Sequence, residues 1–246
     1  MRNKTLFFKK LLLCGIACIA LISTPVSRSN AQAALFILIF GDKVASEKFH
    51  LSMDIGANIS SLNGLNDGKS GIGPNFGLGT HLKLSDEWFF VGEFKPLSQK
   101  GARDVQNPIP IPSELTAIET NSNLKLNYLE LPLLMQYRFS NGFYFSAGPQ
   151  LSFLMSANQK TEVTLSTGTI VNIDQDIEDE FEGMDFSFPV EIAYAIRSVR
   201  QEKGMDIRLR YTQGFGEVFK ESTSRSANFS TIQFIVTFPF VEKEEE

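Results

Sequence analysis

Apolar residues recur at every second position in eight segments of about ten residues, and this alternation constrains the fold more than any other feature of the chain. In the strongest segment, leucine, methionine and aromatic residues alternate with Glu130, Gln136 and Arg138. No long stretch beyond residue 33 has the 3.6-residue period of a helix. The sequence therefore predicts an all-β fold. The eight segments are residues 50–57, 75–84, 88–95, 129–139, 143–155, 186–197, 205–212 and 231–240.

The connections between these segments are alternately long and short. Residues 85–87, 140–142 and 198–204 are short connections, whereas 98–123 and 156–185 are long ones. This alternation is typical of barrels in the bacterial outer membrane, which have short periplasmic turns and longer outer loops. We therefore expect a closed antiparallel transmembrane β-barrel of eight strands, with both ends of the barrel domain on the short-turn side.

The polar phase of the strands carries charges of both signs. An eight-stranded barrel has an interior only wide enough for side chains to fill it, so these charges are expected to pair across the lumen and plug it. The alternative is a soluble, lipocalin-like carrier with the charges outside. Eight faces of bulky residues would overfill such a small interior, which favours lipid on the apolar side. The predicted network comprises four acidic and four basic residues: Glu93, Lys95, Glu130, Arg138, Glu191, Asp206, Arg208 and Arg210.

The chain contains 22 phenylalanines, more than a soluble core of this size would hold comfortably. Many lie next to the short connections, as in the runs 88–90 and 143–145, and Phe238 and Phe240 close the last strand. Aromatic residues gather at the interfaces of membrane barrels. These residues are therefore predicted to form a girdle at the periplasmic rim.

The first 33 residues have the pattern of a secretory signal peptide: a basic start, an apolar run over 11–22 and the exit Ala31-Gln32-Ala33. An uncleaved anchor helix and a lipoprotein modified at Cys18 are the alternatives. The expected division is 1–33 signal peptide, 34–48 periplasmic segment, 49–241 barrel and 242–246 acidic tail. Cleavage would remove both cysteines and five basic residues, which leaves 18 basic against 28 acidic residues, a net charge of −10.

This composition excludes several functions. An acidic mature chain is a poor ligand for nucleic acid. Without cysteine, and with only His50 and His81, it lacks the usual thiol, zinc and histidine-base chemistry. The acidic residues of 174–185 do not have the spacing of a calcium loop and are expected to be solvated, although they could bridge divalent cations to lipopolysaccharide. We expect no cofactor, no metal and no enzymatic role.

Two irregularities interrupt the strand pattern. Four prolines, at 132, 149, 189 and 239, each remove a ladder donor, so bulges or local unpairing are predicted there. Leu124, Leu126 and Tyr128 alternate out of phase with the residues from Leu129 onward, which predicts a further bulge near Tyr128.

The chain resembles the outer-membrane β-barrel domain proteins of Bacteroidetes, often labelled the porin or PorT-like family. The resemblance rests mainly on Asn127-Tyr128-Leu129-Glu130-Leu131-Pro132 and on Ala147-Gly148-Pro149-Gln150-Leu151. It implies a cell-envelope barrel in contact with lipid and lipopolysaccharide and inserted by the barrel assembly machinery. The chain departs from many such barrels because Phe240 is followed by six further residues instead of ending the chain. The expected role is structural, adhesive or limited passive transport, and the rival is surface binding through the loops 98–123 and 156–185.

Overall fold

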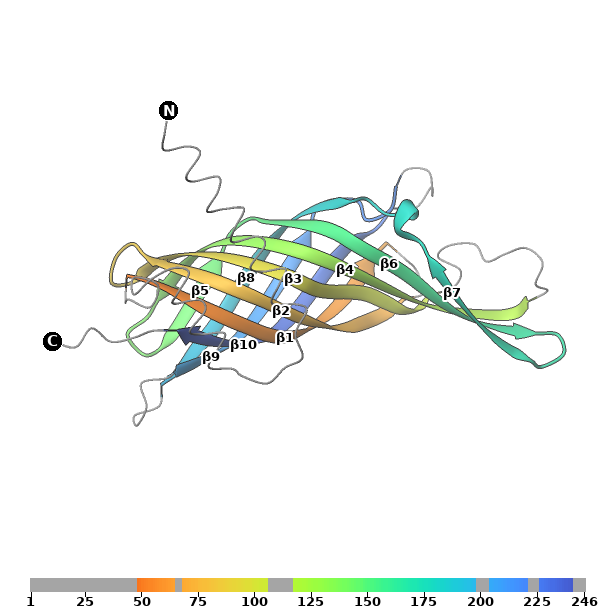
Figure 1. Ribbon diagram of the computed structural model, residues 1–246, viewed down its shortest axis with the longest axis horizontal. Coiled ribbons are helices and arrows are strands. Elements are labelled where there is room, and N and C mark those ends of the chain that lie inside the picture. The colour runs from red at the N-terminus through yellow and green to blue at the C-terminus, as the bar shows by residue number, and fades with distance from the viewer. Residues whose placement is uncertain (1–47, 65–67, 106–116, 198–203, 221–225, 241–246) are drawn as a thin grey trace, which may run out of the picture.

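A computed structural model describes residues 48–64, 68–105, 117–197, 204–220 and 226–240, so the predicted signal peptide and acidic tail lie outside the described residues. These residues form one antiparallel sheet of ten strands and a short 3-10 turn (Figure 1). None of their helices is long and apolar enough to cross a bilayer. The elements are β1 (Phe49–Asn63), β2 (Lys69–Lys83), β3 (Trp88–Val105), β4 (Ala117–Arg138), β5 (Phe143–Ala147), β6 (Gln150–Leu165), β7 (Ile170–Asp176), η2 (Glu178–Glu180), β8 (Met184–Arg197), β9 (Gly204–Gly214) and β10 (Asn228–Phe240).

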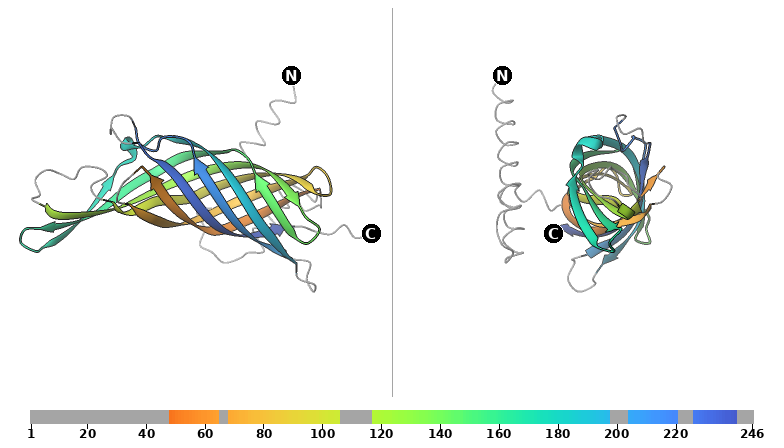
Figure 2. Two further views of the ribbon diagram at one scale, coloured as in Figure 1. Left: turned by 180° about the vertical axis from the view of Figure 1, so that it is seen from behind. Right: turned by 90° about the vertical axis from the view of Figure 1, so that its right-hand side faces the viewer.

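The sheet closes on itself because β3 pairs with β4 as well as with β2. β5 and β6 occupy one place in the ring, since each pairs with β4 on one side and β8 on the other. β7 pairs only with β6 and lies outside the ring. The ring therefore has eight strand positions, and the predicted closed barrel is confirmed; Figure 2 shows it end-on.

The outer surface of the barrel is apolar and the interior is polar. Phe234 and Ile192 are about half exposed, at 54% and 53%, whereas their chain neighbours Gln233 and Glu191 point inward and are buried. A soluble carrier would show the opposite arrangement, with its apolar side chains inside. The predicted faces of the strands are thus the observed ones, and the lipocalin-like alternative does not fit.

The two ends of the barrel differ. One end carries the tight turns 84–87 and 139–142, and we call it the short-turn end. At the other, long-connection end, the strands continue well beyond the predicted segments. The expected loops 98–123 and 156–185 are largely strand: β3 continues to Val105, β4 begins at Ala117, and β6 and β7 form a hairpin that projects past the ring (Figure 1).

The strand predicted over 143–155 is broken at Gly148 and Pro149, between β5 and β6. The strands approach so closely here that a Cβ on Gly148 would lie 2.0 Å from the carbonyl oxygen of Leu133. Pro132 on β4 and Pro189 on β8 flank this break, and the Gly148 N–H donates to the Pro189 carbonyl at 3.3 Å. Pro239 lies beyond the last β9 pairing of β10, where a missing donor costs little.

The irregularity predicted near Tyr128 has a different origin. Within β4 the alternation runs without a break, and both Tyr128 and Glu130 point into the lumen. The extra residues belong to the neighbouring strands: the register slips by one between Lys95 and Ser98 on β3, and again on β6 opposite Tyr128. The apparent change of phase in the sequence therefore marks a change in what fills the lumen, from charged to apolar.

Candidate functional site

The centre of the lumen holds a compact cluster of ion pairs. Arg210 on β9 forms a two-pronged contact with Glu93 on β3, with Nη1–Oε2 at 2.8 Å and Nη2–Oε1 at 2.7 Å. Its Nε donates to Glu191 on β8 at 2.9 Å. Paired, parallel N–H···O contacts of this kind are among the stronger hydrogen bonds in proteins. Arg210 is fully buried, so these contacts replace the water that its charge has lost.

Arg208 extends the cluster to a fourth strand. It pairs with Glu93, with Glu191 at 2.9 Å, and with Asp54 on β1 at 3.0 Å. Thr237 on β10 donates to Asp54 at 2.6 Å. Lys95 completes the group, because its Nζ lies 3.6 Å from Glu93 and 3.3 Å from the side-chain oxygen of Gln233. Three cations thus face three carboxylates, and the cluster is electrically neutral.

A second ion pair lies closer to the long-connection end. Lys100 and Glu130 are 2.7 Å apart, and their side chains are 1% and 0% exposed. The Lys100 ammonium also lies over the ring of Tyr128, 5.0 Å from its centroid. Between the two levels, Asn58 receives a hydrogen bond from Asn75 at 2.7 Å and donates to Ser98 at 3.0 Å. Polar contacts therefore continue along the lumen.

Beyond Tyr128 the lumen is filled mainly by apolar side chains. Segments on either side of the opening, 177–183 and 215–220, fold over it and join through a bridge between Phe181 and Phe219. Their rings lie 4.8 Å apart, and both side chains are at least 98% buried. We call this cluster the apolar cap: Leu62, Ala102, Val105, Leu124, Leu126, Tyr128, Ala157, Ile177, Phe181, Val218, Phe219, Ala227 and Phe229.

The short-turn end is filled by a different set of side chains. The Arg138 guanidinium lies over the ring of Phe89, 3.9 Å from its centroid, and Tyr144 donates to Asp206 at 2.9 Å. His50 and His81, which face each other across β1 and β2, stack with ring centroids 4.6 Å apart. The Nε2 of His81 is 3.0 Å from the hydroxyl of Ser52.

The structure distributes the eight residues of the predicted network over three levels. Five of them meet in the central cluster: Glu93, Lys95, Glu191, Arg208 and Arg210. Glu130 pairs with Lys100 one level away, while Arg138 and Asp206 lie at the short-turn end.

Sequence reasoning missed Asp54, Lys100 and the whole apolar cap. Asp54 stands in the polar phase of its strand and could have been included. Lys100 could not, because the register slip after Lys95 turns it inward where strict alternation places it outward. The cap depends on the contact between 177–183 and 215–220, which no local pattern reveals.

The model of the outer membrane protein beta-barrel domain family matches residues 30–220, which is most of the chain. The chain belongs to this family. An outer-membrane barrel is also what the closed ring, the apolar outside and the charged inside require. No curated protein matches the chain significantly.

Several solved structures are similar to this outer-membrane barrel. Ail, the attachment invasion locus protein of Yersinia pestis, is 11% identical, with 79% of this chain and 99% of that chain covered and a TM-score of 0.40. Neisserial surface protein A is 12% identical over 78% of this chain and 97% of that chain, with a TM-score of 0.36. OprG from Pseudomonas aeruginosa is 10% identical, with 80% of this chain and 98% of that chain covered and a TM-score of 0.33.

Proposed function

We propose that this outer-membrane barrel does not conduct and that its role is structural or adhesive. The observation that carries the proposal is the filled lumen. A solute entering from the long-connection end would meet the apolar cap, and below it the Lys100–Glu130 pair and the central cluster of six charged residues that includes Arg210. Removing one partner of a buried ion pair leaves an uncompensated charge, so the network resists opening.

Conductance across a planar lipid bilayer tests this proposal. Purified full-length protein is inserted into the bilayer at neutral pH. A porin, measured in separate bilayers of the same lipid, is the positive control. We expect no stepwise current at moderate voltage. Recovery of the folded protein from the membrane verifies that it was inserted. Discrete, long-lived current steps from the wild-type protein would contradict a closed lumen and favour passive transport.

An adhesive role is supported by the shape of the long-connection end. The hairpin of β6 and β7 projects past the ring together with the start of β4 (Figure 1). Outer-membrane barrels expose their longer connections at the cell surface, so this sheet would face outside partners. The binding surface would then consist of strands in place of the loops 98–123 and 156–185 that the sequence predicts.

Shortening the hairpin tests the adhesive role. Replacing residues 163–171 by a two-residue turn removes the projecting tip but leaves the ring pairings of β5 with β4 and with β8 intact. Cells expressing the wild-type protein are expected to aggregate and sediment faster than cells expressing the shortened variant at equal surface abundance. Equal sedimentation would count against adhesion through this hairpin.

We also propose that residues 1–33 direct export through the general secretory route and are then removed. The pattern ending at Ala33 supports this, and N-terminal sequencing of the protein from the outer membrane should begin at Ala34. The two proline motifs at 127–132 and 147–151 support the narrower assignment to the Bacteroidetes, PorT-like group and, with it, insertion by the barrel assembly machinery.

We propose that the protein has no enzymatic role. The buried Ser52–His81 contact pairs a hydroxyl with a base, but Ser52 is fully buried and the described residues place no carboxylate on the other ring nitrogen of His81. A serine nucleophile needs an oriented base and access to a substrate. Hydrolysis of a chromogenic ester by the purified protein, lost in Ser52→Ala, would contradict this assignment.

A further inference from the structure

Outward-facing side chains on one wall of the barrel change from apolar to amide to cationic toward the long-connection end. On β3 the order is Leu97, Gln99 and then Arg103. On β4 it is Leu129, Asn127 and then Lys125. The level of these cations is therefore just above the apolar belt, at the height where the polar headgroups of the outer leaflet begin.

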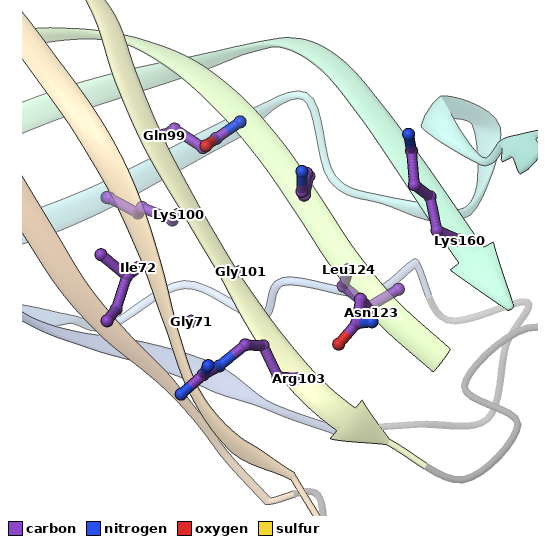
Figure 3. A pocket seen from close by; sticks show the side chains of 10 residues that line it. Gly71, Ile72, Gln99, Lys100, Gly101, Arg103, Asn123, Leu124 and Lys160 are labelled. Carbon is purple, nitrogen blue, oxygen red and sulfur yellow. The ribbon is translucent and has the colours of Figure 1, made fainter. Parts of the chain in front are cut away.

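A groove lies at this level on the outer wall, between β2, β3, β4 and β6. Its volume is about 220 Å³, and its rim includes Ile72, Gln99, Arg103, Asn123, Lys125 and Lys160 (Figure 3). Gly101 contributes to its floor, because that strand runs so close to β4 that a Cβ would lie 2.0 Å from the Leu124 carbonyl oxygen. The groove thus exists because one outward position carries no side chain.

The polar side chains that line the groove are cations and amides, and none of its lining residues is a carboxylate. Arg103 is exposed and is held at the edge of the groove by a hydrogen bond from Nε to the Ser70 carbonyl at 2.9 Å, which leaves its two terminal nitrogens for other acceptors. Neither Arg103 nor Lys125 forms an ion pair with another described residue, whereas Lys160 contacts Asp174 at 3.4 Å. Two cations are therefore available to an anion at this groove.

The next two strands around the ring from β2, which are β1 and β10, provide an internal comparison. At the same end, the outward positions of β1 and β10 carry Ser61, Asn63, Ser230 and Asn228, all of them uncharged. The cations of the groove thus have no counterpart at the outward positions of these two strands. Just below the cations Ile72 is 64% exposed and continues the apolar belt. This arrangement of cations above an exposed apolar side chain matches an amphiphile with a phosphorylated head and an acyl tail.

We propose that this groove binds a phosphate group of a glycolipid in the outer leaflet, with Arg103 and Lys125 as its principal ligands and the amides of Gln99 and Asn123 as further donors. A guanidinium can engage two phosphate oxygens at once, and lysine provides a point charge. This inference rests on the placement of the barrel in the outer membrane, and it names one component of that membrane as a partner.

Native mass spectrometry of the purified full-length protein in detergent tests the proposal. The probes are lipid A with both phosphates and the same lipid with its phosphates removed. Wild-type protein should retain the phosphorylated lipid, and Arg103→Gln/Lys125→Gln should bind it at least tenfold more weakly. The matched control Lys48→Gln/Lys83→Gln removes two cations at the short-turn end and should bind as the wild type does.

Three results would overturn the proposal: equal binding by the groove variant, equal binding of the dephosphorylated lipid, and full displacement of the lipid by inorganic phosphate at equal concentration. The last result would identify a simple anion site. Because both groove residues face outward, the variant should keep the wild-type heat-dependent mobility shift on gels and sediment with the outer membrane. If the wild-type protein did not sediment with the outer membrane, the placement of the barrel in that membrane would be rejected instead.

Discussion

Arg210 and Glu93 join opposite sides of the barrel. Their strands, β9 and β3, are separated by three strands in either direction around the ring, and the two side chains meet through contacts of 2.7 and 2.8 Å. The pair therefore spans the full width of the lumen. A contact across the diameter braces the ring in a way that no ladder hydrogen bond between neighbouring strands can.

Arg210→Gln should destabilise the barrel strongly. It leaves the buried Glu93 and Glu191 with one cation fewer, and breaking a buried pair costs about 3–5 kcal/mol. The midpoint of heat unfolding, followed by the gel mobility of unboiled samples, should fall. Glu93→Gln/Arg210→Gln restores the charge balance and should recover part of the loss. An unchanged midpoint in the single variant would show that the network does not stabilise the ring.

Gly148→Ala should be destabilising because its Cβ would lie 2.0 Å from the Leu133 carbonyl oxygen, and overpacking typically costs about 1–3 kcal/mol. Gly183→Ala is the matched control, since a Cβ there meets no atom within 4 Å. The two variants are compared by urea unfolding in detergent. If both variants unfold at the same urea concentration, Gly148 does not lie as close to Leu133 as the break between β5 and β6 requires.

The pairing at that break was only partly predictable from the sequence. Eight strands, their inward and outward faces and a break at Pro149 follow from period, connection length and proline chemistry. The close approach at Gly148 depends on the positions of β4 and β8, which are set by the register of the whole ring. Local patterns do not contain that register.

The contents of the lumen were predictable only where the phase of a strand is regular. Glu93 and Arg208 share a phase with the polar residues around them, so they could be assigned to the interior. Lys100 could not, because the slip after Lys95 inverts its direction. Tyr128 indicated a bulge on the assumption that every inward side chain is polar, whereas Tyr128 belongs to the apolar cluster that fills the lumen from that level onward.

Phe181→Ala should open the apolar cap without unfolding the barrel. The ring packs against Phe219 at 4.8 Å, and removing a buried phenylalanine costs about 3–5 kcal/mol where the site cannot collapse. Hydrogen exchange should accelerate at the Glu182 and Lys220 amides, which join the two segments of the cap. Phe215→Ala, in the same connection but with a side chain that is 63% exposed, should leave both amides protected. Equal protection in the two variants would contradict the packing of the cap.

Phe234→Arg should impair membrane insertion because its side chain faces lipid, where an arginine costs about 2–4 kcal/mol near the bilayer midplane. Phe234→Leu keeps an apolar surface and should insert normally. The fraction of protein that folds into liposomes, measured by its resistance to protease, distinguishes the two variants. Normal folding of the arginine variant would place this face in water.

The most direct test of a closed, lipid-embedded barrel is membrane fractionation combined with gel migration before and after boiling. The protein should sediment with the outer membrane and migrate faster when unboiled, because the intact ring stays compact in detergent. Recovery as a soluble periplasmic protein, with the same mobility in boiled and unboiled samples, would contradict the account.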